Sequence, residues 1–222
     1  MPAELKEVSC VILVGGESRR MGSDKSKIRL NGRSLLAHVL DAVKDIFRDI
    51  MVSAHTPDYS HDDIKGLCGI RLVTDRVRGR GPSLGVCAAL ESAENPWIFV
   101  LPCDLPMVNV SLIRYLAQLR NGYDCVVPVV GGRIQPLFAL YRKTCLEPLV
   151  ARIGRGGGSK RERGLAGFIE ETEQIKVRYV DESELKEADP ELRSFMDVDT
   201  VEELKKVESI LKKEETAGNE DN

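Results

Sequence analysis

A glycine-rich, basic segment near the amino terminus has the residue types of a phosphate-binding loop. Residues 13–25, LVGGESRRMGSDK, follow a short apolar run. Glycines let the backbone approach a ligand and expose its N–H groups, while arginine and lysine attract polyanions. The spacing fits neither a Walker loop nor a G-x-G-x-x-G turn, which predicts another kind of nucleotide loop, although the first two glycines alone would suit an ordinary turn. The residues concerned are Gly15, Gly16, Gly22, Arg19, Arg20, Lys25 and Lys27.

Two aspartates follow apolar runs of the kind that form buried strands. Asp104 comes after residues 98–101, and Asp75 comes after residues 70–73. Open α/β sheets bind ligands at the carboxyl ends of their strands, so we expect both carboxylates to share a crevice with the glycine-rich loop. Magnesium prefers carboxylate and phosphate oxygens, which makes Asp104 the candidate metal ligand. Either aspartate could instead serve only to form a turn.

Two further basic stretches could meet the same ligand. Residues 76–80 carry three arginines, and residues 152–163 carry five basic residues against one glutamate. Such loops either converge on one polyanion or stay separately solvated, and the sequence leaves both open. The glycine-rich part, residues 154–164, is predicted to be a mobile loop.

Apolar runs alternate with helical patterns along most of the chain. A stripe that includes Leu36, Leu40 and Val43 gives the first helix a core face. This alternation predicts an α/β fold, a doubly wound and mostly parallel sheet with helices on both faces. The runs that predict strands are residues 8–14, 50–54, 70–73, 97–101 and 125–130, with one more strand around residues 135–141, antiparallel and at the far side.

Helix starts are indicated at three places. Ser83 is a candidate cap for one helix, and Asn109 or Ser111 for another. Thr200 and Glu203 have the spacing of a capping box at the start of a third.

Composition sets the broad class of the protein. The chain has 222 residues, 42% of them hydrophobic, and a formal net charge of −3. These values suit a single α/β domain over residues 1–213 with a disordered acidic tail at 214–222, and they suggest neither a nucleic-acid-binding nor a membrane-surface protein. No apolar run approaches the roughly 20 residues that span a bilayer, and the amino terminus does not resemble a signal peptide. We expect a cytoplasmic protein whose six scattered cysteines are free and mostly buried.

The motifs together closely resemble those of the molybdenum cofactor guanylyltransferases. Relatives that use CTP or UTP usually carry alanine where this chain has Gly15, so the Gly-Gly pair favours the guanine branch. The resemblance implies a Rossmann-like nucleotidyltransferase fold and transfer of GMP from GTP to the phosphate of molybdopterin, a molybdenum or tungsten cofactor, with release of pyrophosphate. The matching blocks are residues 13–25, 81–85, 102–106, 135–141 and 195–200.

The resemblance also implies roles for individual residues. Lys25, Arg19 and Asp104 would be catalytic, with Asp104 holding Mg²⁺. Nucleotide contacts would come from Leu13, Val14, Gly15, Gly16, Lys25, Ser53, Asp75 and Asp104. Contacts to the pterin acceptor would come from Gln135, Pro136, Asp197 and Asp199.

The implied chemistry needs no general base. The phosphate monoester of the acceptor has a second pKa of about 6 and already supplies an ionised oxygen. Catalysis would then depend on positioning and on neutralising triphosphate charge. Partners would be GTP and molybdopterin, with cofactor-biosynthesis proteins or acceptor apo-enzymes in addition. The competing hypotheses are a nucleotidyltransferase of the same fold that uses CTP or a sugar phosphate, and a GTP-binding regulator without turnover.

Overall fold

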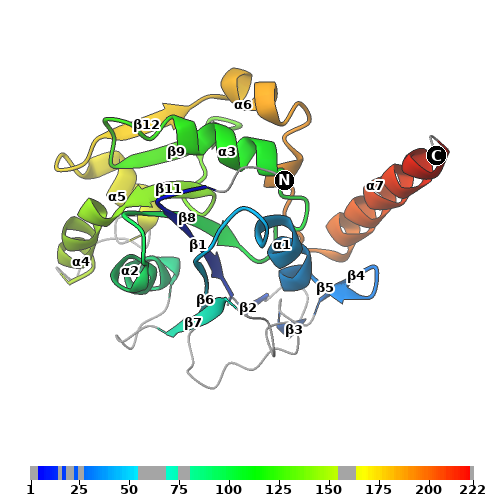
Figure 1. Cartoon of the computed structure of the whole chain (residues 1–222), viewed down its shortest axis with the longest axis horizontal. Coiled ribbons are helices and arrows are strands. Elements are labelled where there is room, and N and C mark those ends of the chain that lie inside the picture. The colour runs from blue at the N-terminus through cyan, green and yellow to red at the C-terminus, as the bar shows by residue number, and fades with distance from the viewer. Residues whose placement is uncertain are drawn as a thin grey trace.

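The computed structural model describes residues 5–14, 17–18, 23–24, 28–54, 69–74, 81–154 and 164–220. Side chains are described in these ranges except at residues 17–18, 23–24 and 214–220. The described part contains a central sheet with helices on both faces (Figure 1). The expected α/β architecture is therefore confirmed.

The sheet has the strand order β10-β9-β11-β8-β1-β6-β7, with β12 paired to β9. Strands β7, β6, β1 and β8 are parallel to one another, and β11 is antiparallel to both β8 and β9. The bounds are β1 Val8–Leu13, β6 Ile50–Ala54, β7 Ile70–Thr74, β8 Trp97–Pro102, β9 Cys125–Val130, β10 Arg133–Ile134, β11 Ala139–Arg142 and β12 Val177–Val180.

Strand β11 lies inside the sheet, whereas the sequence suggested the far side. It pairs Leu140 with Phe99 of β8 and with Val126 of β9. Its residues Ala139 to Tyr141 are fully buried. A strand that is apolar on both faces is suited to an interior position of the sheet, because helices cover both of its sides.

The core consists of two layers, one on each face of the sheet. Alternate residues of β1 enter opposite layers, with Cys10 and Ile12 on the side of α1 and α3, and Val11 on the side of α2, α4 and α5. The period of two in a strand causes this division. The helices are α1 Leu35–Val43, α2 Pro82–Ser92, α3 Val110–Gln118, α4 Leu146–Gly154, α5 Leu165–Glu171 and α6 Glu182–Ala188.

Local capping explains where the helices begin. The Asn109 side chain accepts a hydrogen bond from the Ser111 N–H at 2.8 Å and caps α3. Helix α2 begins at Pro82 instead of being capped by Ser83, which is buried inside its first turn. Gly81 precedes it with φ of 135°, a conformation that side chains disfavour, and proline suits a first helical position.

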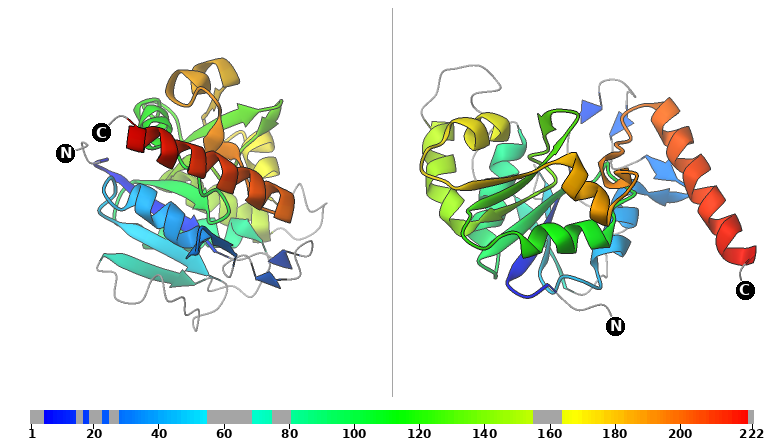
Figure 2. Two further views of the ribbon diagram at one scale, coloured as in Figure 1. Left: turned by 90° about the vertical axis from the view of Figure 1, so that its right-hand side faces the viewer. Right: turned by 90° about the horizontal axis from the view of Figure 1, so that it is seen from above.

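A third, smaller apolar cluster packs the segment around residues 28–35 against residues 198–207. Helix α7, Val201–Glu220, lies beside a ribbon formed by β4, Arg29–Leu30, and β5, Arg33–Ser34 (Figures 1 and 2). Val207 of α7 and Val198 are buried with Ile28, Leu30 and Leu35. The expected disorder of residues 214–222 stays a prediction, although the backbone of α7 is helical as far as Glu220.

A network of hydrogen bonds lies at the amino-terminal ends of β6, β7 and β8. The Asp49 side chain is 3% exposed and accepts hydrogen bonds from Arg71, the closest at 2.6 Å, and from the Glu94 N–H at 3.0 Å. Burial raises the pKa of the Asp49 carboxyl, but the hydrogen bonds from Glu94, Ser9 and Arg71 outweigh it, so the pKa is lowered.

The thiols and helices of the described part agree with two further expectations. Cys10, Cys87, Cys103, Cys125 and Cys145 are buried thiols outside any disulfide, as predicted, and Cys68 lies outside the described residues. Within the same ranges, the structure has no helix that combines the length and the apolar character needed to cross a membrane.

Candidate active site

The carboxyl ends of four parallel strands meet at one edge of the sheet. Leu13 at the end of β1 is in register with Ser53 of β6 and with Pro102 of β8. Ala54 of β6 is in register with Thr74, the last residue of β7. The sequence predicts the nucleotide-binding residues at such an edge. The structure brings together there those of them that it describes.

Backbone hydrogen bonds continue the sheet just beyond β1. The Val14 N–H donates to the Ser53 carbonyl at 2.9 Å, and the Cys103 N–H donates to the Leu13 carbonyl at 3.1 Å. These bonds occupy the Val14 N–H and one lone pair of the Leu13 carbonyl. A ligand would therefore meet the Val14 carbonyl or the second lone pair at Leu13 more readily than the Val14 N–H.

The first turn of α2 packs directly against this edge. A Cβ atom added to Gly85 would lie 2.8 Å from the Ser53 Oγ and 3.1 Å from the Leu13 Cδ2. Only glycine lets the helix approach so closely. Because this contact is made by the first turn, the positive end of the α2 dipole lies near Leu13 and Ser53, and no side chain caps it. Gly85 lies in the matching block 81–85 of the sequence but was given no role there, although a glycine inside a helix is a signal of close packing.

Asp104 lies two residues after β8, on a turn that is hydrogen-bonded to a distant segment. The Val198 N–H donates to the Asp104 carbonyl at 3.0 Å, and Asp104 itself is half-buried. This bond brings the predicted metal ligand next to Asp197 and Asp199, two of the predicted acceptor residues.

Negative charge gathers around this bond. Partial desolvation raises the pKa of Asp197, and the negative charges of Glu203, Asp199 and Asp104 raise it further. Asp197 is exposed, so water screens these charges, but its surroundings are acidic. Such surroundings attract cations.

The donor set suits magnesium held between protein and substrate. Among the described residues, no group of three or more His, Cys, Asp or Glu side chains is arranged to hold a metal ion by itself. Magnesium in triphosphate sites usually takes only one or two carboxylates and completes its shell with phosphate oxygens and water. The half-buried Asp104, in its acidic surroundings, fits that role.

The two predicted acceptor segments are joined by aromatic packing. Gln135 and Pro136 form a turn closed by the Phe138 N–H, which donates to the Gln135 carbonyl at 3.1 Å. The Phe138 ring lies 4.9 Å from the ring of Phe195, centroid to centroid, and Phe195 precedes Asp197 by two residues. The turn is also held by the buried Tyr141 hydroxyl, which donates to the Pro136 carbonyl at 2.6 Å.

Several predicted site residues lie outside the described residues. These are Gly15, Gly16, Arg19, Arg20, Gly22, Lys25, Lys27 and Asp75, together with residues 76–80 and 155–163 of the two other basic stretches. Their roles stay predictions. In the chain, Gly15 follows Val14 and Asp75 follows Thr74, the residues at which the described edge stops.

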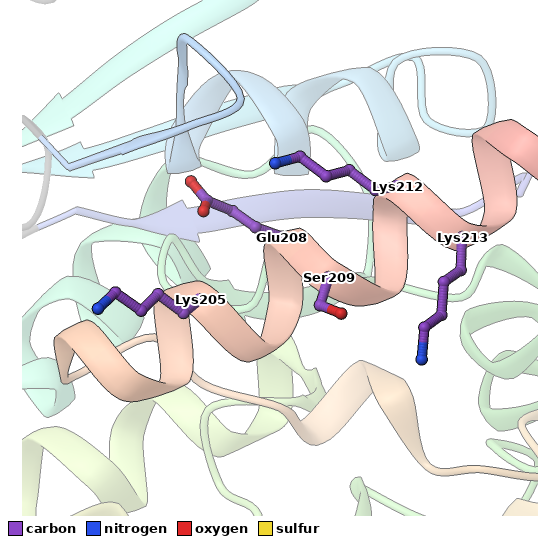
Figure 3. A pocket seen from close by; sticks show the side chains of 5 residues that line it. All are labelled: Lys205, Glu208, Ser209, Lys212 and Lys213. Carbon is purple, nitrogen blue, oxygen red and sulfur yellow. The ribbon is translucent and has the colours of Figure 1, made fainter.

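A hollow on α7 lies apart from these residues. It is lined by Lys205, Glu208, Ser209, Lys212 and Lys213, all from the one helix (Figure 3). None of the predicted site residues lines it, so it does not compete with the sheet edge as the place of nucleotide chemistry.

Comparison with known proteins agrees with the fold and the motifs. Residues 10–174 match the family model described as the MobA-like NTP transferase domain. A protein of Desulfosudis oleivorans named molybdenum cofactor guanylyltransferase is 33% identical over 207 residues, which cover 92% of this chain and 96% of that protein. A probable molybdenum cofactor guanylyltransferase of Pelotomaculum thermopropionicum is also 33% identical, over 88% of this chain and 89% of that protein.

Solved structures show the same architecture. The molybdopterin-guanine dinucleotide biosynthesis protein A of Archaeoglobus fulgidus superposes with a TM-score of 0.78 at 25% identity, covering 92% of this chain and 99% of that one. The 2-C-methyl-D-erythritol 4-phosphate cytidylyltransferase of Thermus thermophilus has a TM-score of 0.65 at 21% identity, covering 92% of this chain and 98% of that one, which shows a shared fold alone.

Proposed function

The chain belongs to the MobA-like NTP transferase family, and from this membership we propose that it transfers GMP from GTP to the phosphate of molybdopterin and releases pyrophosphate. The observation that carries the proposal is the shared edge at which Leu13, Ser53 and the turn of Asp104 meet. In this family context, that edge is the place for a nucleotide and its metal ion.

The reaction is a substitution at the α-phosphorus of GTP. An ionised oxygen of the acceptor phosphate forms the new bond to this phosphorus, the bond from it to the bridging oxygen of the β-phosphate breaks, and pyrophosphate leaves with its electron pair. Because the attacking oxygen is already ionised, no side chain has to remove a proton. The protein's part is to align the two phosphates and to offset their charge.

We assign the base to the edge formed by Leu13, Val14 and Ser53, with Asp75 next to it in the chain. The glycine-rich loop that follows β1 would hold the triphosphate through Gly15 and Gly16. Asp104 would hold Mg²⁺, which when bound neutralises part of the triphosphate charge. The acceptor would lie toward Gln135, Pro136, Asp197 and Asp199, and partner proteins that supply or receive the cofactor would approach from outside this site.

Asp104→Asn tests the metal assignment. The amide keeps the shape of the side chain but loses the charge, so we expect kcat/KM to fall by about 100-fold and higher Mg²⁺ to restore part of it. Activity unchanged at low Mg²⁺ would exclude Asp104 as the metal ligand.

Lys25→Ala tests the cationic loop. Lys25 would form its strongest contact as charge moves onto the departing pyrophosphate, so kcat should fall more than KM for GTP rises. The opposite pattern would mean that Lys25 serves ground-state binding only.

Nucleotide choice and product identity test the function as a whole. GTP with Mg²⁺ at a hundred times its Kd should add about 2.7 kcal/mol of stability, and CTP at the same concentration much less. Incubation with each nucleoside triphosphate and molybdopterin, followed by mass analysis, should give the guanine dinucleotide and pyrophosphate. Equal stabilisation by GTP and CTP would contradict the guanine assignment, and tight GTP binding without pyrophosphate release would favour a regulatory protein.

A further inference from the structure

Glu203 makes an unusual double contact at the start of α7. Its Oε2 accepts hydrogen bonds from two consecutive N–H groups, those of Asp199 and Thr200, both at 2.8 Å. The Thr200 Oγ1 in turn accepts from the Glu203 N–H at 3.2 Å. The capping box predicted from the sequence is therefore present, and it extends one residue further toward Asp197.

The segment that Glu203 holds is the one bonded to Asp104. Val198 adjoins Asp199 and donates its N–H to the Asp104 carbonyl at 3.0 Å. Val198 is also fully buried beside Leu30, Leu35 and Val207, which restricts its movement. Glu203 is thus linked to Asp104 in two steps. Its carboxylate binds the Asp199 N–H, and the adjoining buried Val198 binds the Asp104 carbonyl.

Helix capping alone does not account for this arrangement. Helix α6 has a capping box of the same kind, in which Asp181 accepts from the Glu184 N–H at 3.1 Å and donates its own N–H to the Glu184 Oε2 at 3.4 Å. There the glutamate oxygen has one backbone N–H donor and holds no segment bonded to Asp104. At α7 the second donor, Asp199, transfers the constraint to Val198.

We propose that Glu203 is a positioning residue that, through Asp199 and Val198, holds Asp104 where it binds the divalent cation of the nucleotide complex. The proposal rests on the proposed function, because it gives Asp104 its metal role. It predicts that the Glu203 carboxylate affects metal-dependent nucleotide affinity more than it affects the fold.

The test measures binding without turnover. Isothermal titration with guanosine α,β-methylene triphosphate, with and without Mn²⁺, gives the factor by which metal increases nucleotide affinity. We expect Glu203→Ala to lower this factor by about 10-fold, as found for residues that orient metal ligands, with metal-free affinity unchanged within about twofold. Glu203→Gln keeps an acceptor oxygen and should stay within about twofold of the wild-type protein.

Two controls separate positioning from capping and from charge. Glu184→Ala removes the corresponding glutamate of α6 and should leave the metal factor unchanged. In an Asp104→Asn background, Glu203→Ala should have no further effect, because the two residues act on one step.

Each outcome bears on the proposal. If Glu203→Gln lowered the metal factor as much as Glu203→Ala, the charge of Glu203, and not the position that it gives Asp104, would set the metal affinity. Additive effects in the double variant would mean that Glu203 acts apart from Asp104. Either result overturns the proposal, as does Glu203→Ala with a lower melting temperature and an unchanged metal factor. A wild-type protein without any metal-dependent gain would contradict the metal role within the proposed function itself.

Discussion

Gly85→Ala should disturb the nucleotide edge through a single methyl group. The added Cβ would lie 2.8 Å from the Ser53 Oγ and 3.1 Å from the Leu13 Cδ2, both closer than ordinary van der Waals contact. Ser53 is 4% exposed and Val14 is bonded to its carbonyl, so the neighbours have little room to move. The Ser53 hydroxyl and the Leu13 methyl group must turn away into packed surroundings, or α2 must move away from the ends of β1 and β6.

The expected magnitude is the difference between two opposing effects. Alanine in place of glycine inside a helix gains about 1 kcal/mol, while overpacking a buried site costs about 1–3 kcal/mol. The net effect should therefore be a loss of up to about 2 kcal/mol, which for a chain of this size lowers Tm by up to about 4–8 °C. A shift of a few tenths of an ångström at the base should lower kcat/KM for GTP by about 3- to 10-fold.

Thermal unfolding and steady-state kinetics measure these two effects. Gly154→Ala is the matched control, because no atom lies within 4 Å of its added Cβ at this last residue of α4. It should leave kcat/KM unchanged and should not lower Tm, since alanine in a helix gains at most about 1 kcal/mol. Adding Ser53→Ala to Gly85→Ala removes the 2.8 Å contact and leaves a carbon at 3.7 Å, so it should recover about half of the lost stability. A Gly85→Ala protein with wild-type Tm and kcat/KM, or a double variant less stable than Gly85→Ala, would refute the reasoning.

Three further predictions concern the polar contacts around the core. Arg71→Ala leaves the buried Asp49 carboxylate without its closest partner. The free energy of unfolding measured in urea should fall by about 2 kcal/mol, and not more, because Arg71 is partly exposed and water screens the pair. Because the Asp49 pKa is lowered, its stabilisation is present above its unfolded pKa of about 4 and is lost as the pH falls through the lower folded pKa. Arg71→Ala should therefore move acid unfolding to higher pH, and an unchanged midpoint would contradict this. Tyr141→Phe leaves the Pro136 carbonyl without its 2.6 Å donor and should cost about 1 kcal/mol, raising KM for the acceptor but not for GTP.

The sequence was most informative where burial is continuous. The runs at 50–54 and 125–130 match β6 and β9 residue for residue, because strands covered by helices on both faces read as unbroken apolar segments. Asn109 and the Thr200–Glu203 box were found because capping needs particular side chains at fixed spacing.

The order of the strands in the sheet could not be predicted from the sequence in the same way. The position of β11 between β8 and β9 depends on which neighbours a strand chooses, and an apolar run carries no record of that choice. Elements α5, β12 and α6 were not predicted, since segments of four to seven residues are too short for a clear period.

For the site, the motifs provided candidate residues but did not show how those residues are held. Leu13, Ser53 and Asp104 lie at the expected edge. The close approach of Gly85 to Ser53 and the hydrogen bond from Val198 to Asp104 are tertiary contacts between segments far apart in the chain. No local pattern reports such contacts.

The apolar cluster shared by α7 and the β4–β5 ribbon has a consequence for synthesis on the ribosome. Leu30 and Leu35 are made early, but the side chains of Val198 and Val207 that cover them are made more than 150 residues later. Until then, Leu30 and Leu35 are exposed to solvent and prone to aggregation unless a chaperone or a transient collapse of the chain covers them. The nascent chain therefore cannot complete the packing around Leu30 and Leu35 until residues 198–207 have emerged.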